Sequence, residues 1–324
     1  MGRRSGPAAA AGRGGGRLAG VLGGSAGLVA LVGAWAKLLG PSGGEAGPTV
    51  PAVASSPSVD VYIGAHADDW MLFVGDRAYA SLLAARKTLF VYVTAGDAGG
   101  GAAYWTTRER AARAGVDAVI GPGGWTCRAA SVRAHLVQRC TKDRAVSYFL
   151  RLPDGNSRDG LGHGRGSLPL LRDRGTPATA LDGSATYRSW RDLYETVGAI
   201  VDAESAPSNL PTVHAPDTGR SLNPADHPDH WAAGDAVAAA AAARSWQLRW
   251  SVDYHTHSLP SNLGAARHAA KVRVFGAYDD VMRSAGFESY RDAGNYRKWL
   301  WRTYVRGDPP ASADPQAASL PAPP

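Results

Sequence analysis

Two short segments of this 324-residue sequence carry imidazoles and carboxylates at spacings suited to binding a metal ion. Residues 64–70 read Gly-Ala-His-Ala-Asp-Asp-Trp, and residues 223–230 read Asn-Pro-Ala-Asp-His-Pro-Asp-His. Zinc favours imidazole and carboxylate ligands, and a catalytic zinc keeps one coordination position for water. We therefore predict an open metal site formed by His66, Asp69 and His230.

Asp68 supplies a further carboxylate that the predicted metal site does not use. A free carboxylate beside a metal-activated water can accept a proton from it, as general-base hydrolysis requires. Residues 64–70 taken alone would equally suit a polar loop whose Asp caps a helix. Residues 223–230, with two more imidazoles, favour the metal site.

Both segments follow runs that are typical of buried strands. Residues 59–64 are apolar and β-branched, and residues 89–94 repeat this pattern before a glycine-rich loop at 95–101. An Ala-rich stretch at 106–120 predicts a helix that ends at Gly121. Alternation of strand and helix predicts parallel strands, whose carboxyl ends are where sites form.

The rest of the central region predicts more elements of both kinds. We expect an antiparallel pair at 131–139 and 145–152, a long loop at 158–183, a helix at 187–203, a strand at 212–215, a helix at 231–246, a strand at 251–255 and a helix at 265–285. The predicted fold class is α/β, a Rossmann-like layered fold with a mostly parallel sheet and helices on both faces.

These motifs resemble those of a known family. Residues 66–69 resemble the His-Pro-Asp-Asp motif of the LmbE/PIG-L family, which comprises zinc-dependent, N-acetylglucosaminyl deacetylase-like enzymes, and residues 227–230 match its His-x-Asp-His motif. The loop at 94–97 is also similar. The resemblance extends from residue 59 to about residue 287, and two separated motifs in the right order make it specific.

The resemblance implies a hydrolase acting on linear amide C–N bonds, a zinc-dependent N-deacetylase. It would remove an N-acyl group, expected to be N-acetyl, from an amino sugar or glycoconjugate by a zinc-activated water. The three predicted ligands would hold Zn²⁺ or another divalent transition metal. Asp68 would be the general base, His227 would stabilise the oxyanion or protonate the leaving amine, and Asp229 would orient His227.

Two other functions are weighed against this one. An inactive carbohydrate-binding or envelope-binding protein on the same scaffold would need neither a base nor an acid, so the retained Asp68 and His227 argue against it. A dinucleotide-binding enzyme would carry a Gly-x-Gly-x-x-Gly fingerprint after the first strand, and the sequence has none there.

The first motif departs from the family at two positions, because Ala67 and Trp70 stand where Pro and Glu are usual. These changes leave the predicted metal ligands and general base in place, and they bear on which substrate the site accepts. Trp70 either stacks on a sugar face at the mouth of the site or packs in the core.

Several other side chains are candidates for the substrate pocket. Asp97, on the glycine-rich loop, either binds substrate hydroxyls or caps a helix, and Asp154 closes the run at 145–152. His255 and His257 lie on one face of the expected late strand and would line the pocket. Arg108 and Glu109 either face the site as a pair or lie on the solvated face of their helix, and the many arginines of that helix favour the solvated face.

The two ends of the chain differ from the central region. A basic stretch followed by an apolar one over residues 1–37 predicts a signal peptide or an uncleaved membrane anchor. A flexible linker is expected at 38–57, the catalytic domain at 58–307 and a disordered tail at 308–324. The expected location is extracellular, or membrane-anchored with an extracytoplasmic catalytic domain, so membrane contact would involve the N-terminal segment.

The net charge limits the kinds of binding partner that we expect, and the two cysteines raise the question of a disulfide. The formal net charge is +7, but much of the excess lies in the leader, and no nucleic-acid-binding motif accompanies it. We expect a small-molecule or glycoconjugate substrate and no nucleic acid. The two cysteines, Cys127 and Cys140, either form a disulfide, as export would allow, or remain free thiols.

Overall fold

The computed structural model describes residues 58–155, 166–206, 209–291 and 293–307. The expected leader, linker and tail lie outside these residues, as does part of the expected loop at 158–183. Within the described part of the chain, no helix has the length and apolar character needed to cross a bilayer.

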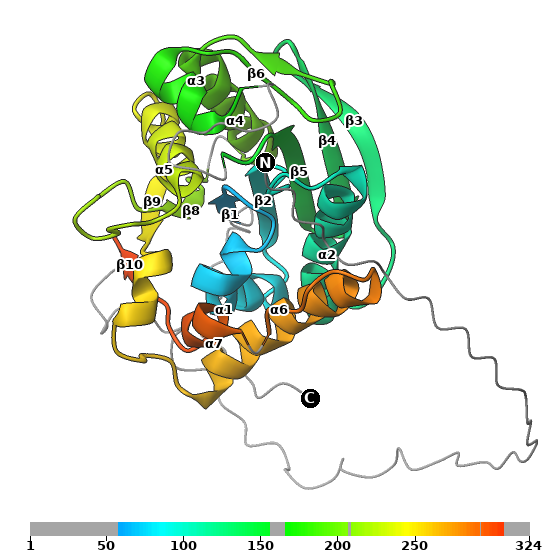
Figure 1. Ribbon diagram of the computed structural model, residues 1–324, viewed down its shortest axis with the longest axis vertical. Coiled ribbons are helices and arrows are strands. Elements are labelled where there is room, and N and C mark those ends of the chain that lie inside the picture. Colours follow the sequence, from blue (N-terminus) through cyan, green and yellow to red (C-terminus); the bar gives the residue numbers. More distant parts are fainter. Residues whose placement is uncertain (1–57, 156–165, 207–208, 292, 308–324) are drawn as a thin grey trace, which may run out of the picture. The chain divides into compact units, whose positions relative to one another are not determined.

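An eight-stranded sheet forms the centre of the domain, with the strand order β10-β9-β8-β1-β2-β5-β4-β3 (Figure 1). The strands from β9 to β5 run parallel, and the outer strands β10, β4 and β3 are antiparallel to their neighbours. Their bounds are β1 Val59–Gly64, β2 Lys87–Thr94, β3 Thr126–Val132, β4 His135–Lys142, β5 Ala145–Leu152, β8 Thr212–Pro216, β9 Gln247–Ser251 and β10 Val305–Arg306. A small second sheet pairs β6 (Ala178–Thr179) with β7 (Thr186–Tyr187).

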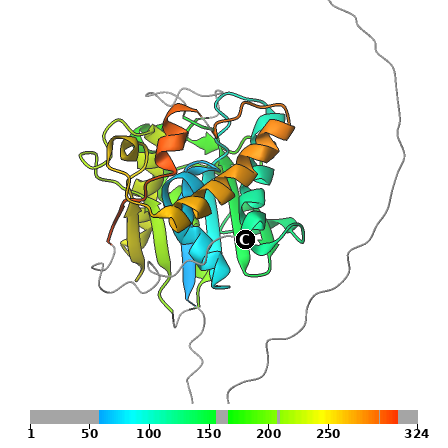
Figure 2. The ribbon, with the colours of Figure 1, turned by 90° about the horizontal axis from the view of Figure 1, so that it is seen from below.

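Helices cover both faces of the sheet. On one face α1 (Asp69–Leu83), α2 (Ala102–Ile120) and α6 (Ala265–Ser284) pack together, and Figure 2 shows α6 crossing beside α1. The other face holds α3 (Leu168–Arg174), α4 (Trp190–Glu204) and α5 (Pro228–Ala241). A 3₁₀ helix, η1 (Tyr254–Ser258), and α7 (Gly294–Trp299) complete the described fold.

The domain has two hydrophobic cores, one on each face of the sheet, and side chains that alternate along the central strands contribute to both. Leu89 and Val91 of β2 belong to the core under α3, α4 and α5, whereas Phe90 and Tyr92 belong to the core under α1, α2 and α6. Successive side chains on a strand point to opposite faces, so a strand buried on both faces must be apolar throughout. This requirement explains the continuous apolar runs in the sequence and confirms the predicted α/β class.

Three expected elements differ from the structure. The expectation of a long loop at 158–183 is wrong in its described part, because α3 and β6 lie within it. The expected strand at 251–255 is wrong, because β9 ends at Ser251 and Tyr254–Ser258 forms η1. The expected antiparallel pair corresponds to β4 and β5, but a further strand, β3, pairs with β4. Cys127 of β3 is paired with Cys140 of β4, and the two residues form a disulfide, so the free-thiol alternative does not apply.

A buried polar network joins the C-terminal segment to α1 and α6. The Nζ of Lys271, on α6, donates to the carbonyl oxygen of Trp299 at 2.9 Å. Asp76, on α1, accepts from the hydroxyl of Thr303 at 2.7 Å and from Arg267 Nε at 2.8 Å. Asp76 and Lys271 are almost completely buried. The network therefore holds Trp299 in a defined position beside α1.

Replacing Asp76 with alanine should strongly destabilise the domain. Asp76→Ala removes the acceptor of Arg267 and Thr303 and the larger of the two buried carboxylate charges that act on Lys271, so we expect a loss of about 3–5 kcal/mol in the free energy of unfolding. Urea denaturation measures it. The control Asp280→Ala breaks exposed pairs with Arg283 and Arg291 and should cost less than about 1 kcal/mol. An equal loss of unfolding free energy in the two variants would show that the buried network does not stabilise the domain.

Candidate metal centre

The two sequence motifs meet at one edge of the sheet. Residues 65–68 connect β1 to α1, and residues 217–227 connect β8 to α5. Strands β1 and β8 are adjacent and parallel, with Tyr62 paired to His214, so their carboxyl ends emerge side by side. Side chains at this edge converge in the way expected for a site in an open α/β sheet.

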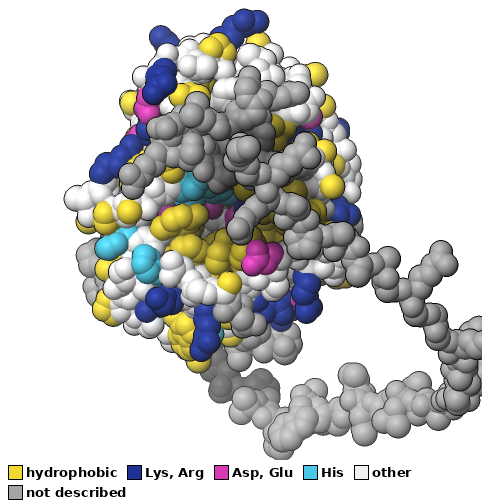
Figure 3. Space-filling model, viewed as in Figure 1, with side chains coloured by type: hydrophobic (Ala, Val, Ile, Leu, Met, Phe, Trp, Pro, Cys, Tyr) yellow, Lys and Arg dark blue, Asp and Glu magenta, His cyan; other side chains and the backbone are white. Residues whose placement is uncertain are grey.

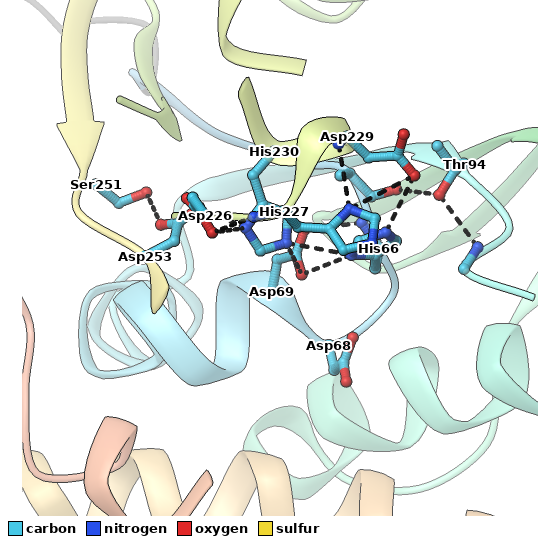
Figure 4. A network of polar contacts seen from close by, with 12 residues as sticks. His66, Asp68, Asp69, Thr94, Asp226, His227, Asp229, His230, Ser251 and Asp253 are labelled. Carbon is cyan, nitrogen blue, oxygen red and sulfur yellow. Dashed lines mark hydrogen bonds and ion pairs between the residues drawn. The ribbon is translucent and has the colours of Figure 1, made fainter. Parts of the chain in front are cut away.

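His66, Asp69 and His230 form a buried triangle (Figure 4). His66 Nδ1 lies 3.2 Å from His230 Nε2 and 3.4 Å from Asp69 Oδ1, and His230 Nε2 lies 3.2 Å from Asp69 Oδ1. A tetrahedral zinc with bonds of about 2.0–2.2 Å places its ligand atoms about 3.3–3.6 Å apart. The triangle therefore has close to the size that a zinc ion requires.

Hydrogen bonds outside the triangle orient its two imidazoles. His230 Nδ1 lies 2.9 Å from Asp226 Oδ1, and His66 Nε2 lies 3.4 Å from Asp229 Oδ2. A proton on each outer nitrogen leaves a lone pair on each inner nitrogen. Asp69 Oδ2 is occupied by the backbone N–H of His66, so its Oδ1 also faces inward. Three acceptors converge, an arrangement that fits a cation, and the carboxylate partners are those typical of metal-ligating histidines.

The electrostatics of the site also favour a cation. Burial by itself lowers the pKa of His66, but the carboxylates of Asp69 and Asp154 outweigh it and raise that pKa well above its usual value. The pKa of His230 is raised in the same way by Asp69 and Asp226, against the effect of burial. The negative charge that produces these shifts would equally stabilise a divalent ion.

His227 lies beside the triangle as the N-cap of α5. Its Nδ1 accepts a hydrogen bond from the backbone N–H of Asp229 at 3.2 Å, and its Nε2 lies 3.5 Å from Asp154 Oδ1. Burial, followed by the charges of the neighbouring histidines, lowers the pKa of His227 to about 3. The imidazole is therefore neutral, with its proton on Nε2.

Asp229 contacts more than the predicted partner. Its Oδ2 is 3.8 Å from His227 Nδ1, but it lies closer to His66 Nε2, at 3.4 Å, and accepts from the Gly155 N–H at 2.8 Å. The backbone N–H of Asp229, rather than its carboxylate, makes the hydrogen bond to His227. Burial raises the pKa of Asp229 to about 6. Asp229 thus lies between His66, a predicted metal ligand, and His227.

Asp68 lies beside the triangle, with its Oδ1 turned towards α2 (Figure 4). Its Oδ1 accepts from Arg108 Nη2, and Arg108 also donates to the Tyr278 hydroxyl at 2.7 Å and to the Gly96 carbonyl. The expectation that Arg108 and Glu109 lie on a solvated face is wrong, because both are buried. The sequence contained one sign that Arg108 is buried. Arg108 precedes the buried Ala111 and Ala112 by three and four residues, so all three lie on one face of the helix.

A cavity of about 180 Å³ opens beside these groups, and Figure 3 shows a hollow with histidine side chains inside it and hydrophobic ones along its wall. Aromatic side chains from α2 and from the C-terminal third line much of it: Tyr104, Tyr254, Tyr278, Tyr290, Tyr296 and Trp299. Sequence reasoning missed these residues, because isolated aromatics carry no motif.

The remaining pocket candidates divide into two groups. Asp154 lines the cavity, and its backbone N–H donates to Asp97 Oδ1 at 2.9 Å. Asp97 is buried behind it and also accepts from Gly99, so its contacts stabilise the loop. Trp70 is buried against Phe90, and its Nε1 donates to the Tyr92 hydroxyl at 3.0 Å, so the structure supports the core-packing alternative for Trp70.

The expectation for His255 and His257 fails for a geometric reason. Both residues lie on η1 instead of a strand, and neither belongs to the residues that line the cavity. His257 Nδ1 lies 2.6 Å from the carbonyl oxygen of Tyr254. It is Tyr254, the first residue of η1, that reaches the cavity.

Residues 61–241 match the family model described as PIG-L, GlcNAc-PI de-N-acetylase. No curated protein is similar enough in sequence to count as a match.

Solved structures to which this chain is similar include three at low sequence identity. N,N'-diacetylchitobiose deacetylase from Pyrococcus horikoshii is 14% identical, with 70% of this chain and 73% of that chain covered and a TM-score of 0.41. The zinc-inhibited form of teicoplanin deacetylase is 14% identical, with 74% and 90% covered and a TM-score of 0.44. A conserved protein from Thermus thermophilus is 16% identical, with 79% and 96% covered and a TM-score of 0.40.

Metal content tests the triangle directly. We expect wild type to hold about one ion per chain after dialysis against zinc and His230→Ala to hold none. Asp226→Ala should weaken binding about 10–100-fold, because His230 loses the carboxylate that orients it. Asp202→Ala, which removes an exposed carboxylate on α4, is the matched control. Undiminished metal in His230→Ala would exclude the triangle as the binding site.

Proposed function

Since the chain belongs to the PIG-L family of GlcNAc-PI de-N-acetylases, we propose that it is a metal-dependent N-deacetylase. Its reaction would be hydrolysis of the N-acyl amide, expected to be N-acetyl, of an amino sugar or related glycoconjugate. The observation that carries the proposal is the buried triangle of His66, Asp69 and His230 with Asp68 and His227 at the same cavity.

Zinc is the metal that the donor set and its dimensions support, although the same ligands would accept Fe²⁺, Co²⁺ or Mn²⁺. A bound zinc would polarise the amide carbonyl and lower the pKa of a water molecule. The side chains of this protein would then provide the orientation and the proton transfers.

Asp68 is assigned as the general base. Its Oδ1 is held by Arg108, which leaves Oδ2 as the oxygen able to accept a proton from the attacking water. Arg108 is itself fixed by Tyr278 and by the Gly96 carbonyl, so the carboxylate has a defined orientation. The proton accepted on Oδ2 can be passed to the amide nitrogen as the C–N bond breaks, which yields a carboxylate and a free amine.

His227 is assigned as the donor to the developing oxyanion. Its neutral form carries the proton on Nε2, because Nδ1 accepts from the first turn of α5. A neutral imidazole with this orientation donates a hydrogen bond without giving up its proton. Of the two roles that the sequence left open for His227, the structure favours oxyanion stabilisation over protonation of the leaving amine.

The cavity walls support an amino sugar or glycoconjugate as the substrate. The half-buried rings of Tyr104, Tyr254 and Tyr296 line the cavity, and aromatic rings of this kind can pack against the apolar face of a sugar. Asp154 offers a carboxylate to the hydroxyl groups of the sugar. Polar groups convergent with aromatic walls are typical of small-molecule sites. Tyr254 also contacts His230 edge-on, with ring centroids 4.8 Å apart, so this wall begins at the metal site.

We also propose that the enzyme acts outside the cytoplasm. The basic and apolar pattern of residues 1–37 supports export, and the disulfide between Cys127 and Cys140 is of a kind that persists in oxidising compartments. Whether the leader is cleaved or retained as an anchor stays a prediction.

Amine release from a panel of N-acetyl amino sugars tests the proposed reaction. We expect the zinc-loaded wild type to release amine, and Asp68→Asn to bind metal normally but lose activity by about 10²–10⁴-fold, because asparagine can still accept from Arg108 but cannot take a proton. Asp173→Asn, at an exposed position on α3, is the control and should be fully active. Metal binding without amine release from any substrate would favour the inactive binding protein.

The assignment of His227 makes a separate prediction. His227→Ala should lower kcat by about 10²–10³-fold with little change in bound metal, because only the oxyanion donor is lost. The dependence of kcat on pH separates the two roles of His227. A neutral donor adds no basic limb to the wild-type profile between about pH 5 and 8. A proton donor must itself be protonated, so a fall of kcat with rising pH that disappears in His227→Ala would identify His227 as the proton donor.

A further inference from the structure

A second cavity, of about 510 Å³, lies on the side of α2 that faces β3, β4 and β5. The metal-centre cavity shares none of its lining residues. Polar and basic groups dominate the lining: Thr106, Thr107, Glu109, Arg110 and Arg113 of α2, with Cys127, Gln138 and Arg151 of the strands. Tyr104 and Arg108 of the same helix line the metal-centre cavity instead.

The charges around this cavity are unbalanced. Arg151 is neutralised, because its Nε and Nη2 donate to the two oxygens of Glu109 at 2.6 and 2.8 Å and its Nη1 lies 2.6 Å from Asp182. Within the described part of the chain, no carboxylate lies within ion-pair distance of Arg110 or Arg113. Two guanidinium groups at one turn's spacing on α2 therefore have no direct ion-pair partner, and the carboxylates of Glu109 and Asp117 act on Arg113 only from a greater distance.

Arg113 is the more unusual of the two cations. It is partly buried, and its Nη1 lies 2.7 Å from Cys127 Sγ and 3.1 Å from Cys140 Sγ. Disulfide sulfurs are weak acceptors, so these contacts compensate little of the guanidinium charge. Burial lowers the pKa of Arg113; the carboxylates of Glu109 and Asp117 offset part of this effect, and Arg110 adds to the lowering. A partly buried cation next to a like charge is stabilised when an anion binds.

Hydrogen-bond donors also outnumber acceptors in this cavity. Arg110 Nη2 donates to Thr107 Oγ1 at 2.8 Å, and both threonine hydroxyls donate to carbonyl oxygens of α2. Gln138 Nε2 lies 4.0 Å from Cys140 Sγ, so its amide has a weak partner there. The carboxylate of Glu109 is occupied by Arg151. A ligand that fits these walls must bring acceptor atoms and negative charge.

We propose that this cavity binds a phosphate or sulfate group through Arg110, Arg113 and Gln138. Guanidinium groups present paired donors that match the oxygens of these anions, and two such groups on one wall can hold a tetrahedral oxyanion from two sides. The anion is either free or carried by a larger molecule, such as a phosphorylated sugar. The site does not depend on the proposed deacetylase reaction, since none of its residues takes part in that reaction.

Calorimetric titration of the zinc-loaded protein with inorganic phosphate tests this site. We expect saturable binding of one anion per chain in wild type, and a loss of affinity of roughly tenfold or more in both Arg110→Gln and Arg113→Gln, because each removes a charged donor. Arg188→Gln replaces an exposed arginine away from the cavity and should bind as wild type does. Arg110 is exposed, so its variant should fold even if Arg113→Gln does not.

A parallel titration with glucose 6-phosphate distinguishes the two sources of the anion. Tighter binding than inorganic phosphate, lost in the same variants, would identify a phosphorylated saccharide as the ligand class, and equal binding would identify the free anion. Absence of saturable binding in wild type would overturn the proposal. Phosphate binding that is unchanged in both arginine variants would also overturn it, because the anion would then lie at the metal centre or elsewhere.

Discussion

Parallel pairing of β1 with β8 is the constraint on which the candidate site depends. The two strands are separated by about half of the domain in sequence, yet their carboxyl ends emerge side by side. His66 and Asp69 follow one strand and His230 follows the other, so only this pairing completes the triangle. Apolar side chains on both faces of β1 and β2 fix the register, because a shift by one residue would exchange the two cores.

Around the triangle, each important side chain has a partner that sets its direction. Asp226 and Asp229 orient the two imidazoles, the first turn of α5 orients His227, and Arg108 orients Asp68. These partners are buried, where an unpaired polar group is costly. These hydrogen bonds therefore hold the predicted site residues in a defined arrangement before any ligand binds.

The C-terminal third of the chain adds a wall that the matched family region lacks. The family model ends at residue 241, whereas Tyr254, Tyr278, Tyr296 and Trp299 come later and line the cavity. Trp299 stacks on Tyr254 with centroids 4.8 Å apart, and the buried Lys271 holds the backbone of Trp299. The chemistry and the shape of the pocket thus come from different parts of the sequence.

The sequence by itself determined the class of fold, the order of most elements and the residues expected to bind metal and move protons, because strand periodicity and two local motifs are properties of neighbouring residues. Only the tertiary structure decided that Arg108 pairs with Asp68, that Trp70 packs in the core, that Asp226 supports His230 and that Tyr254 reaches the cavity where His257 does not. Such contacts depend on how distant helices and strands pack, and the type of a residue does not indicate which distant residue it will contact.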